Sequence, residues 1–286
     1  MSLSLVSGGY AEGYNSASGG SIATSGTITV ADGDLIVVFA SFQDGASTTI
    51  EISDGTHTYE HEDVISEPSA TYGYAVHAYV LSATAGTYTF TATFGASRQW
   101  RAIYAYAFRP DSGDVVSRLD YKSGSGSSTS ALTDNLATDG TETDSVMVAG
   151  EVQAGMGNQT NELIGEALTR ADDSIGYQGG VFYTFSTGSI DGSHAQCTVA
   201  SGDWAIGVIA FKASPPTLNQ EGFRFRNDDG DEASATWLEA QDTDVTAPMD
   251  TNTRIRFIVD GTLDPASTQF QLEAKLSTDS VWWKVE

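Results

Sequence analysis

The sequence is poor in cysteine, proline and long apolar runs. It has 286 residues, with one cysteine and six prolines. A single cysteine, Cys197, cannot form an intramolecular disulfide, which excludes a small secreted domain held together by disulfides. The densest apolar run, residues 35–40, is too short to cross a bilayer as a helix. The first residues have neither the basic nor the apolar region of a signal peptide, so no export signal is expected there.

Positive charge is also scarce. The chain has 13 Lys and Arg against 38 Asp and Glu, which gives a net charge of −25. Binding to nucleic acids or anionic membranes needs clustered Lys and Arg, so the composition argues against both as partners. A hydrophobic fraction of 40% and an aromatic fraction of 10% exclude a disordered chain. The acidity instead favours a soluble surface that resists non-specific association.

Helical periodicity is nearly absent, whereas alternation of apolar and polar residues is frequent. β-branched and aromatic runs alternate with Gly, Ser, Asp and Asn, a pattern typical of strands and turns. The fold class that we expect is therefore all-β. In the first 110 residues, the expected strands span residues 21–30, 35–42, 48–53, 56–61, 72–81, 87–94 and 100–108. The strand at 35–42 is so apolar that we expect both its faces to be covered.

The pattern restarts after a Ser- and Gly-rich spacer at residues 122–133, which is typical of a linker or strand edge. GDLIVVFAS (33–41) is similar to TDSVMVAGE (143–151), and residues 72–110 are similar to residues 175–213. We interpret this as a weak internal repeat. It allows two architectures, which are one sandwich built from two related half-sheets or two separate small sandwiches.

A second boundary lies at Ser214-Pro-Pro-Thr217, because two prolines favour an extended junction. The sequence thus predicts a β-sandwich domain over residues 1–213 and a smaller β domain over residues 217–286. Both parts are acidic, so the charge is not confined to a tail.

The smaller block has several spaced motifs: Phe-Arg-Phe-Arg-Asn-Asp-Asp-Gly (223–230), Ala-Thr-Trp-Leu (235–238), Arg-Ile-Arg-Phe (254–257), Asp-Pro (264–265) and Trp-x-x-Val (282–285). In these motifs it resembles Ig-like or fibronectin-like β domains of structural proteins in tailed bacteriophages. In GDLIVVFAS and the strands at 87–94 and 104–108, the first 213 residues resemble jelly-roll or lectin-like sandwiches. Such sandwiches occur in phage virion proteins and in bacterial surface or carbohydrate-active proteins.

The resemblance implies a jelly-roll-like β-sandwich followed by an Ig-like β-sandwich. It implies a non-enzymatic virion structural protein, such as a capsid decoration protein, a head fibre or a tail appendage, on the virion surface. Its partners would be other copies of itself and other capsid or tail proteins, with a host-surface glycan as a further partner. Two alternatives stay open: a carbohydrate-binding module or cell-surface adhesin, and a β-sandwich glycan lyase or hydrolase.

No residue pattern indicates catalysis, a cofactor or a metal site. His57 and His61 would lie about 13 Å apart on a strand, too far to share one metal ion. The acidic run at 227–232 does not have the ligand spacing of an EF-hand loop, and a hairpin turn at Asp229-Gly230 explains it more simply. His194 and Cys197 would point to opposite faces of one strand and could not form a dyad.

The candidate contact residues are aromatic. Tyr72 and Tyr74, with Tyr79, Tyr104 and Tyr106, could line a sugar-stacking face, although core and subunit-interface positions are favoured for them. Adjacent Trp282 and Trp283 must point to opposite faces of their strand, so one can be core and the other a contact with a neighbouring subunit or partner. We therefore select Trp282, Trp283, Tyr72 and Tyr74 as candidates for interface or ligand contact.

Overall fold

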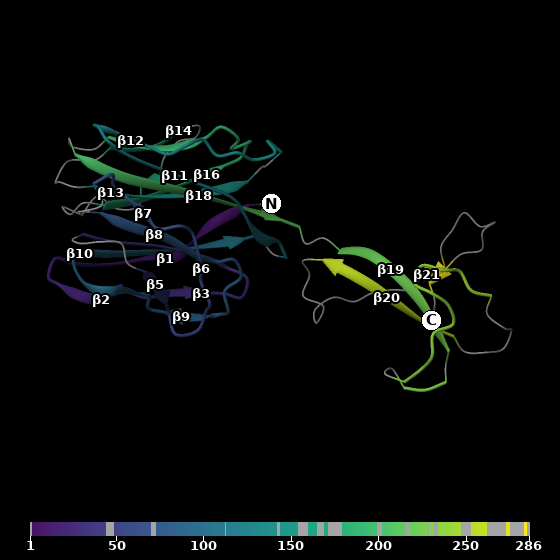
Figure 1. Cartoon of the computed structure of the whole chain (residues 1–286). Coiled ribbons are helices and arrows are strands. Elements are labelled where there is room, and N and C mark those ends of the chain that lie inside the picture. The colour runs from purple at the N-terminus through teal and green to yellow at the C-terminus, as the bar shows by residue number, and fades with distance from the viewer. Residues whose placement is uncertain are drawn as a thin grey trace. The chain divides into compact units, whose positions relative to one another are not determined.

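The computed structural model describes most of the first 215 residues and parts of the remainder (Figure 1). The described residues are 2–43, 49–69, 73–111, 113–141, 144–153, 160–164, 169–170, 179–198, 202–215, 218–227, 229–231, 234–246, 253–261, 273–274 and 283–284. Within these ranges the regular structure is entirely strand, so the predicted all-β class is confirmed. The chain divides between Pro215 and Pro216 into two compact units.

Two antiparallel main sheets form the centre of the first unit. The first sheet has the order β1-β10-β4-β8-β6, and the second has the order β11-β18-β13-β16-β15. The strands of the first are β1 (Leu3–Asn15), β10 (Thr91–Pro110), β4 (Leu35–Gln43), β8 (Tyr74–Val80), β6 (Glu60–His61) and, beside β8, β7 (Ile65–Ser66). Those of the second are β11 (Val115–Ser127), β18 (Asp203–Ser214), β13 (Ser145–Gln153), β16 (Gly179–Ser186) and β15 (Thr169–Arg170).

Shorter strands form an outer layer on each main sheet. Outside the first sheet, residues 91–98 of β10 pair with β2 (Gly19–Ala23) and β5 (Ile50–Ser53), and β3 (Ile28–Val30) pairs with β9 (Gly86–Tyr88). Outside the second, β17 (His194–Thr198) lies between β12 (Ser130–Leu132) and β14 (Thr160–Ile164). The first unit is thus a stack of four β layers (Figure 1).

Three hydrophobic cores separate these layers. The central core joins the main sheets through ring contacts such as Tyr106–Tyr183, with centroids 5.5 Å apart, and Tyr79–Phe211, at 5.2 Å. The outer cores contain Phe42, Phe90 and Phe94 on one side and Leu136, Phe182, Ile190 and Trp204 on the other. Every residue of β4 is buried, as expected for a strand covered on both faces, because β4 lies between the central core and an outer core.

The two halves of this unit have the same topology. Strands β1, β10, β4 and β8 occupy the same order as β11, β18, β13 and β16. The first part of β10 pairs with β2 and β5, as β17 pairs with β12 and β14. Both architectures allowed by the sequence are therefore partly present, because each half is a small sandwich with its own core and the two halves share a third core.

The alignment of residues 33–41 with 143–151 is wrong by one residue. It matches Ile36, which faces an outer core, with Val146, which faces the central core. Strand pairing instead makes Leu35 equivalent to Val146, because they pair with Phe108 and Phe211 at matching positions of β10 and β18. Side chains alternate between faces along a strand, so a shift of one residue exchanges the two cores.

Of the two interpretations of the Ser- and Gly-rich segment at 122–133, the strand edge is confirmed and the linker is wrong, since β11 and β12 occupy most of it and both are edge strands of their sheets. Its glycines permit close packing between layers. A Cβ added to Gly126 would lie 2.6 Å from the Trp204 ring, and one added to Gly124 would lie 2.1 Å from the Leu132 carbonyl oxygen. The expected strand at 21–30 is also divided into β2 and β3, where the Ser25 N–H donates to the Glu12 carbonyl oxygen.

The second unit contains two short antiparallel pairs in its described part. One pairs β19 (Leu218–Asn227) with β20 (Thr253–Gly261), and the other pairs β21 (Glu273–Ala274) with β22 (Trp283–Lys284). An antiparallel bridge between Arg226 and Trp237 adds a third segment beside β19. These pairs fit an all-β unit, and the Ig-like assignment of residues 217–286 stays a prediction.

Candidate functional sites

Asp54, His57 and Tyr59 form a buried hydrogen-bonded group after β5. The His57 Nδ1–H donates to Asp54 Oδ2 at 2.6 Å, and the Tyr59 hydroxyl donates to the same oxygen at 2.9 Å. The Thr84 backbone N–H donates to His57 Nε2 at 2.9 Å. Because Nε2 accepts this bond, the ring is the neutral Nδ1–H tautomer and neither nitrogen is available to a substrate. The group is therefore a structural clamp and not a catalytic base.

Several hydrogen bonds stabilise the charge on Asp54. Burial raises the pKa of this carboxyl group, but hydrogen bonds from His57, Thr56 and Tyr59 outweigh burial and lower the pKa below its ordinary value. His61, by contrast, is exposed on β6. Within the described ranges, no three His, Cys, Asp or Glu side chains are grouped so as to hold a metal ion.

His77 lies in the central core between the main sheets, and half-buried Tyr121 packs against that core. The His77 ring is fully buried, with centroids 4.9 Å from Phe39 and 5.8 Å from Tyr121. Neither nitrogen of His77 has a hydrogen-bond partner, and burial lowers its pKa to about 3. The Tyr121 hydroxyl also has no hydrogen-bond partner, and burial raises its pKa. Both groups are neutral at physiological pH and closed to solvent.

Cys197 is fully buried in the outer core of the second half. Burial raises the pKa of its thiol, and the charge of buried Glu151 raises it further. A thiol with a raised pKa in an apolar core is unreactive. The burial pattern of β17 alternates, with Cys197 buried and His194 half-buried three positions earlier, so the residues lie on opposite faces as predicted.

The structure places one aromatic candidate in a core. Tyr74 is 3% exposed and stacks on Phe42, with centroids 5.2 Å apart and ring planes 14° apart. It is therefore corrected from a contact candidate to a core residue, because β8 is covered on both faces. Tyr79, Tyr104 and Tyr106 are buried as well, in agreement with the core positions favoured for them. Tyr72 and Trp282 lie outside the described residues, and Trp283 is described only through the pairing of β22.

Pairing beside the acidic run begins farther from Asp229-Gly230 than the hairpin turn predicted there, because Arg226 is bridged to Trp237. The chain returns along β19 with hydrogen bonds from the Asn227 N–H to the Thr236 carbonyl, at 3.0 Å, and from the Leu238 N–H to the Phe225 carbonyl, at 3.0 Å. The Asp229 carboxylate closes the turn by accepting the N–H and hydroxyl of Thr236 at 2.9 and 2.5 Å. Those bonds lower the pKa of Asp229, and the nearby positive charge of Arg226 contributes.

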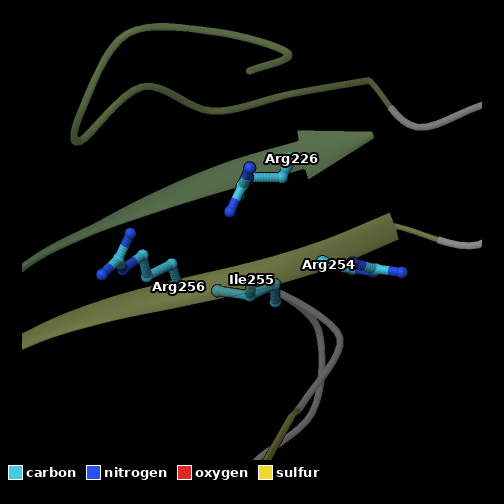
Figure 2. Close-up of a pocket in the computed structure, with 4 residues that line it drawn as sticks. All are labelled: Arg226, Arg254, Ile255 and Arg256. Atoms are coloured by element: carbon cyan, nitrogen blue, oxygen red, sulfur yellow. The ribbon is translucent and has the colours of Figure 1, made fainter. Parts of the chain in front are cut away.

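An arginine cluster is the feature that the sequence reasoning missed. Register places Arg224 opposite Arg256 and Arg226 opposite Arg254 on the β19–β20 ribbon. Figure 2 shows Arg226 on β19 facing β20, where Arg254 and Arg256 flank Ile255, and these four residues line a pocket of about 200 Å³. The sequence signal is the pair of motifs at 223–226 and 254–257, in which arginine occupies every second position.

Comparison with known proteins identifies no relative of the chain. No protein-family model matches the chain, and no curated protein or solved structure shows significant similarity to it. No helix long and apolar enough to span a membrane occurs among the residues described. Function is therefore inferred from the residues of the chain itself.

Proposed function

We propose that this chain is a non-enzymatic structural protein of a tailed-bacteriophage particle, displayed on the virion surface as a capsid decoration protein, head fibre or tail appendage. The observation that carries the proposal is the four-layer β stack of residues 1–215, a duplicated sandwich with three filled cores. Such a body is rigid, because close-packed interiors resist deformation. Rigidity suits a protein that must hold its shape on the outside of a particle.

The enclosed positions of the side chains that could act as bases or nucleophiles support a structural role. His57 and Asp54 hold a turn, His77 lies between two sheets, and Cys197 is enclosed in a core. A general base or nucleophile must reach its substrate within hydrogen-bond distance. None of these four groups presents a free reactive atom to solvent.

The charge also supports display at high copy number. A net charge of −25 makes neighbouring copies and unrelated macromolecules repel one another at long range. Attachment to the particle would then depend on specific short-range complementarity with capsid or tail proteins and with other copies of the chain. This resistance to non-specific adhesion is useful for a surface that meets the host environment.

Immunogold electron microscopy tests the proposal. Antibody raised against the second unit would be applied to lysates and intact cells of the source culture, with antibody absorbed on the purified protein as the control. Gold on phage heads or tails is the expected result, and its position distinguishes a decoration protein or head fibre from a tail appendage.

Two other outcomes would contradict the virion assignment. Gold on cell envelopes with unlabelled particles would favour the alternative of a carbohydrate-binding module or adhesin. In that case a glycan array with the purified protein follows, and breakdown of an arrayed glycan would indicate the lyase or hydrolase instead.

A further inference from the structure

Four of the nine arginines in this acidic chain lie on one face of the β19–β20 ribbon. Directly opposite residues of an antiparallel pair have Cβ atoms about 5 Å apart, and like charges in that position are destabilising. The cross-strand pairs Arg224–Arg256 and Arg226–Arg254 thus concentrate positive charge where strand pairing alone would disfavour it. A local arrangement that lowers stability is typical of a functional site, so this cluster is a candidate for ligand binding.

Trp237 and backbone carbonyls orient two of these guanidinium groups. Arg224 and Arg226 lie over the Trp237 ring, with their Cζ atoms 4.3 and 4.7 Å from the ring centroid. The Arg224 Nε–H donates to the Glu239 carbonyl oxygen at 2.8 Å, and Arg226 Nη2 donates to the Ala235 carbonyl oxygen at 2.5 Å. Guanidinium groups held in this way are pre-organised, so the arginine side chains lose less conformational entropy when a ligand binds.

The strand opposite supplies the exposed side of the cluster. Arg226 is only 5% exposed, whereas Arg254 and Arg256 lie on the exposed strand β20. Arg256 makes no hydrogen bond or ion pair with any of the described residues. The pocket between Arg226, Arg254 and Arg256 is open to solvent at β20 and has Ile255 as its apolar side (Figure 2).

We propose that this pocket binds an oxyanion group, which is a phosphate, a sulfate or a carboxylate carried by a ligand. Guanidinium groups recognise these planar and tetrahedral anions through paired N–H donors. A volume of about 200 Å³ accommodates one such group with a few water molecules, each of which occupies about 30 Å³. The charge of the whole chain repels an extended polyanion, so the ligand has one anionic group and not a polymer of them.

The neighbouring acidic turn places one carboxylate near the cluster. The Asp229 carboxylate lies close enough to Arg226 for its pKa to be lowered by that charge, so it offsets part of the positive field. Binding therefore depends on Arg254 and Arg256, which lie on the other strand. This site is independent of the proposed virion role, since an oxyanion could be bound in any location.

Isothermal titration calorimetry of the full chain tests the site with sodium phosphate, sodium sulfate and sodium glucuronate at constant ionic strength. We expect saturable binding of at least one of the three. Arg256→Gln should weaken it about tenfold, and Arg254→Gln with Arg256→Gln should weaken it further. Arg256→Lys should retain part of the affinity, because the charge remains while the paired donors are lost.

Lys212→Gln is the matched control, because it removes one positive charge from β18 in the first unit. If Lys212→Gln binds the anions with wild-type affinity, the weaker binding of the Arg256 variants is due to the pocket and not to the change in net charge. Tighter phosphate or sulfate binding indicates a ligand with a tetrahedral group, and tighter glucuronate binding indicates a carboxylate ligand. The proposal is overturned by no saturable binding of the three anions, or by equal losses in Lys212→Gln and Arg256→Gln. Far-ultraviolet circular dichroism confirms that each variant is folded.

Discussion

At the scale of single residues, burial decides what the ionisable side chains do. His57 is held between the Asp54 carboxylate and the Thr84 N–H, and His77 has no hydrogen-bond partner among the described residues. A buried hydrogen-bonded group stabilises its surroundings, whereas a buried unpartnered one lowers stability whenever it becomes charged. The two histidines therefore have opposite effects on stability, although the sequence around them gives the same strand pattern.

His77 should make the protein sensitive to acid. Its pKa is about 3 in the folded state against an ordinary 6.5, so the unfolded state binds more protons between these values. The stability associated with neutral His77 is complete above pH 6.5 and is lost as the pH falls towards 3, by up to about 1.4 kcal/mol per pH unit. His77→Phe should flatten the dependence of unfolding free energy on pH in urea titrations between pH 7 and pH 4.5. Parallel wild-type and variant curves would refute it.

The Asp54–His57 clamp should contribute measurable stability. His57→Ala leaves the Thr84 N–H without its acceptor and removes a bond to Asp54, and we expect a loss of about 1–3 kcal/mol. His61→Ala, on exposed β6, is the control and should change stability by less than about 0.5 kcal/mol. Urea unfolding at pH 8 measures both, and equal effects would mean that the clamp has no special role.

At the scale of elements, the positions of small and large residues determine how the layers fit. Gly150 on β13 faces Phe39 on β4 across the central core, and Gly207 on β18 faces His77 and Tyr121. Strand β10 passes from an outer layer into a main sheet at a register shift between Gln99 and Ala102, where Trp100 has a φ of 50°. A positive φ is unfavourable for a bulky residue, so the bend is imposed by the two layers that β10 joins.

Gly150→Ala should destabilise the central core. A Cβ at this position would lie 2.4 Å from the Phe39 ring, so the main sheets must move apart or the ring must leave its rotamer. We expect a loss of about 1–3 kcal/mol. Gly188→Ala is the matched control, because a Cβ there meets no atom within 4 Å. Thermal unfolding followed by calorimetry compares the two, and a Gly150→Ala protein as stable as the control would show that this contact is loose.

At the scale of the whole molecule, the chain is two units joined at consecutive prolines. The first unit has three cores of its own, and the second is a separate compact unit. Units that each bury their own apolar surface unfold independently unless a large interface couples them. The acidic charge extends over both units, and the arginine cluster on β19 and β20 is the local exception to it.

The first unit should fold without the second. A chain of residues 1–215 should unfold in one transition at the temperature of the matching transition in the full chain, within about 2 °C. Differential scanning calorimetry gives both temperatures. A fall of about 5 °C or more in the shortened chain would mean that the units stabilise each other.

Predictions from local patterns were accurate for strands and less accurate for how those strands pair. Alternation and the dense strand at 35–42 predicted the all-β class and the burial of β4. For the spacer at 122–133, composition allowed a linker or a strand edge, and only the structure shows two edge strands whose glycines pack against Trp204 and Leu132. The arginine cluster was missed because alternation predicts that residues share a face of a strand, but only pairing shows which residues lie opposite each other.

The sequence alone determined the local features of this protein: its strand class, its acidity, its single unpaired cysteine and the proline junction. These features depend on amino-acid composition and on the spacing of residues within one strand or junction. They therefore do not depend on which strands pair. The tertiary structure decided the four-layer stacking, the one-residue shift of the repeat, the burial of Tyr74 and His77, and the convergence of four arginines on one ribbon. Those features depend on which distant strands pair and which faces meet, and period-two patterns are equally compatible with many pairings.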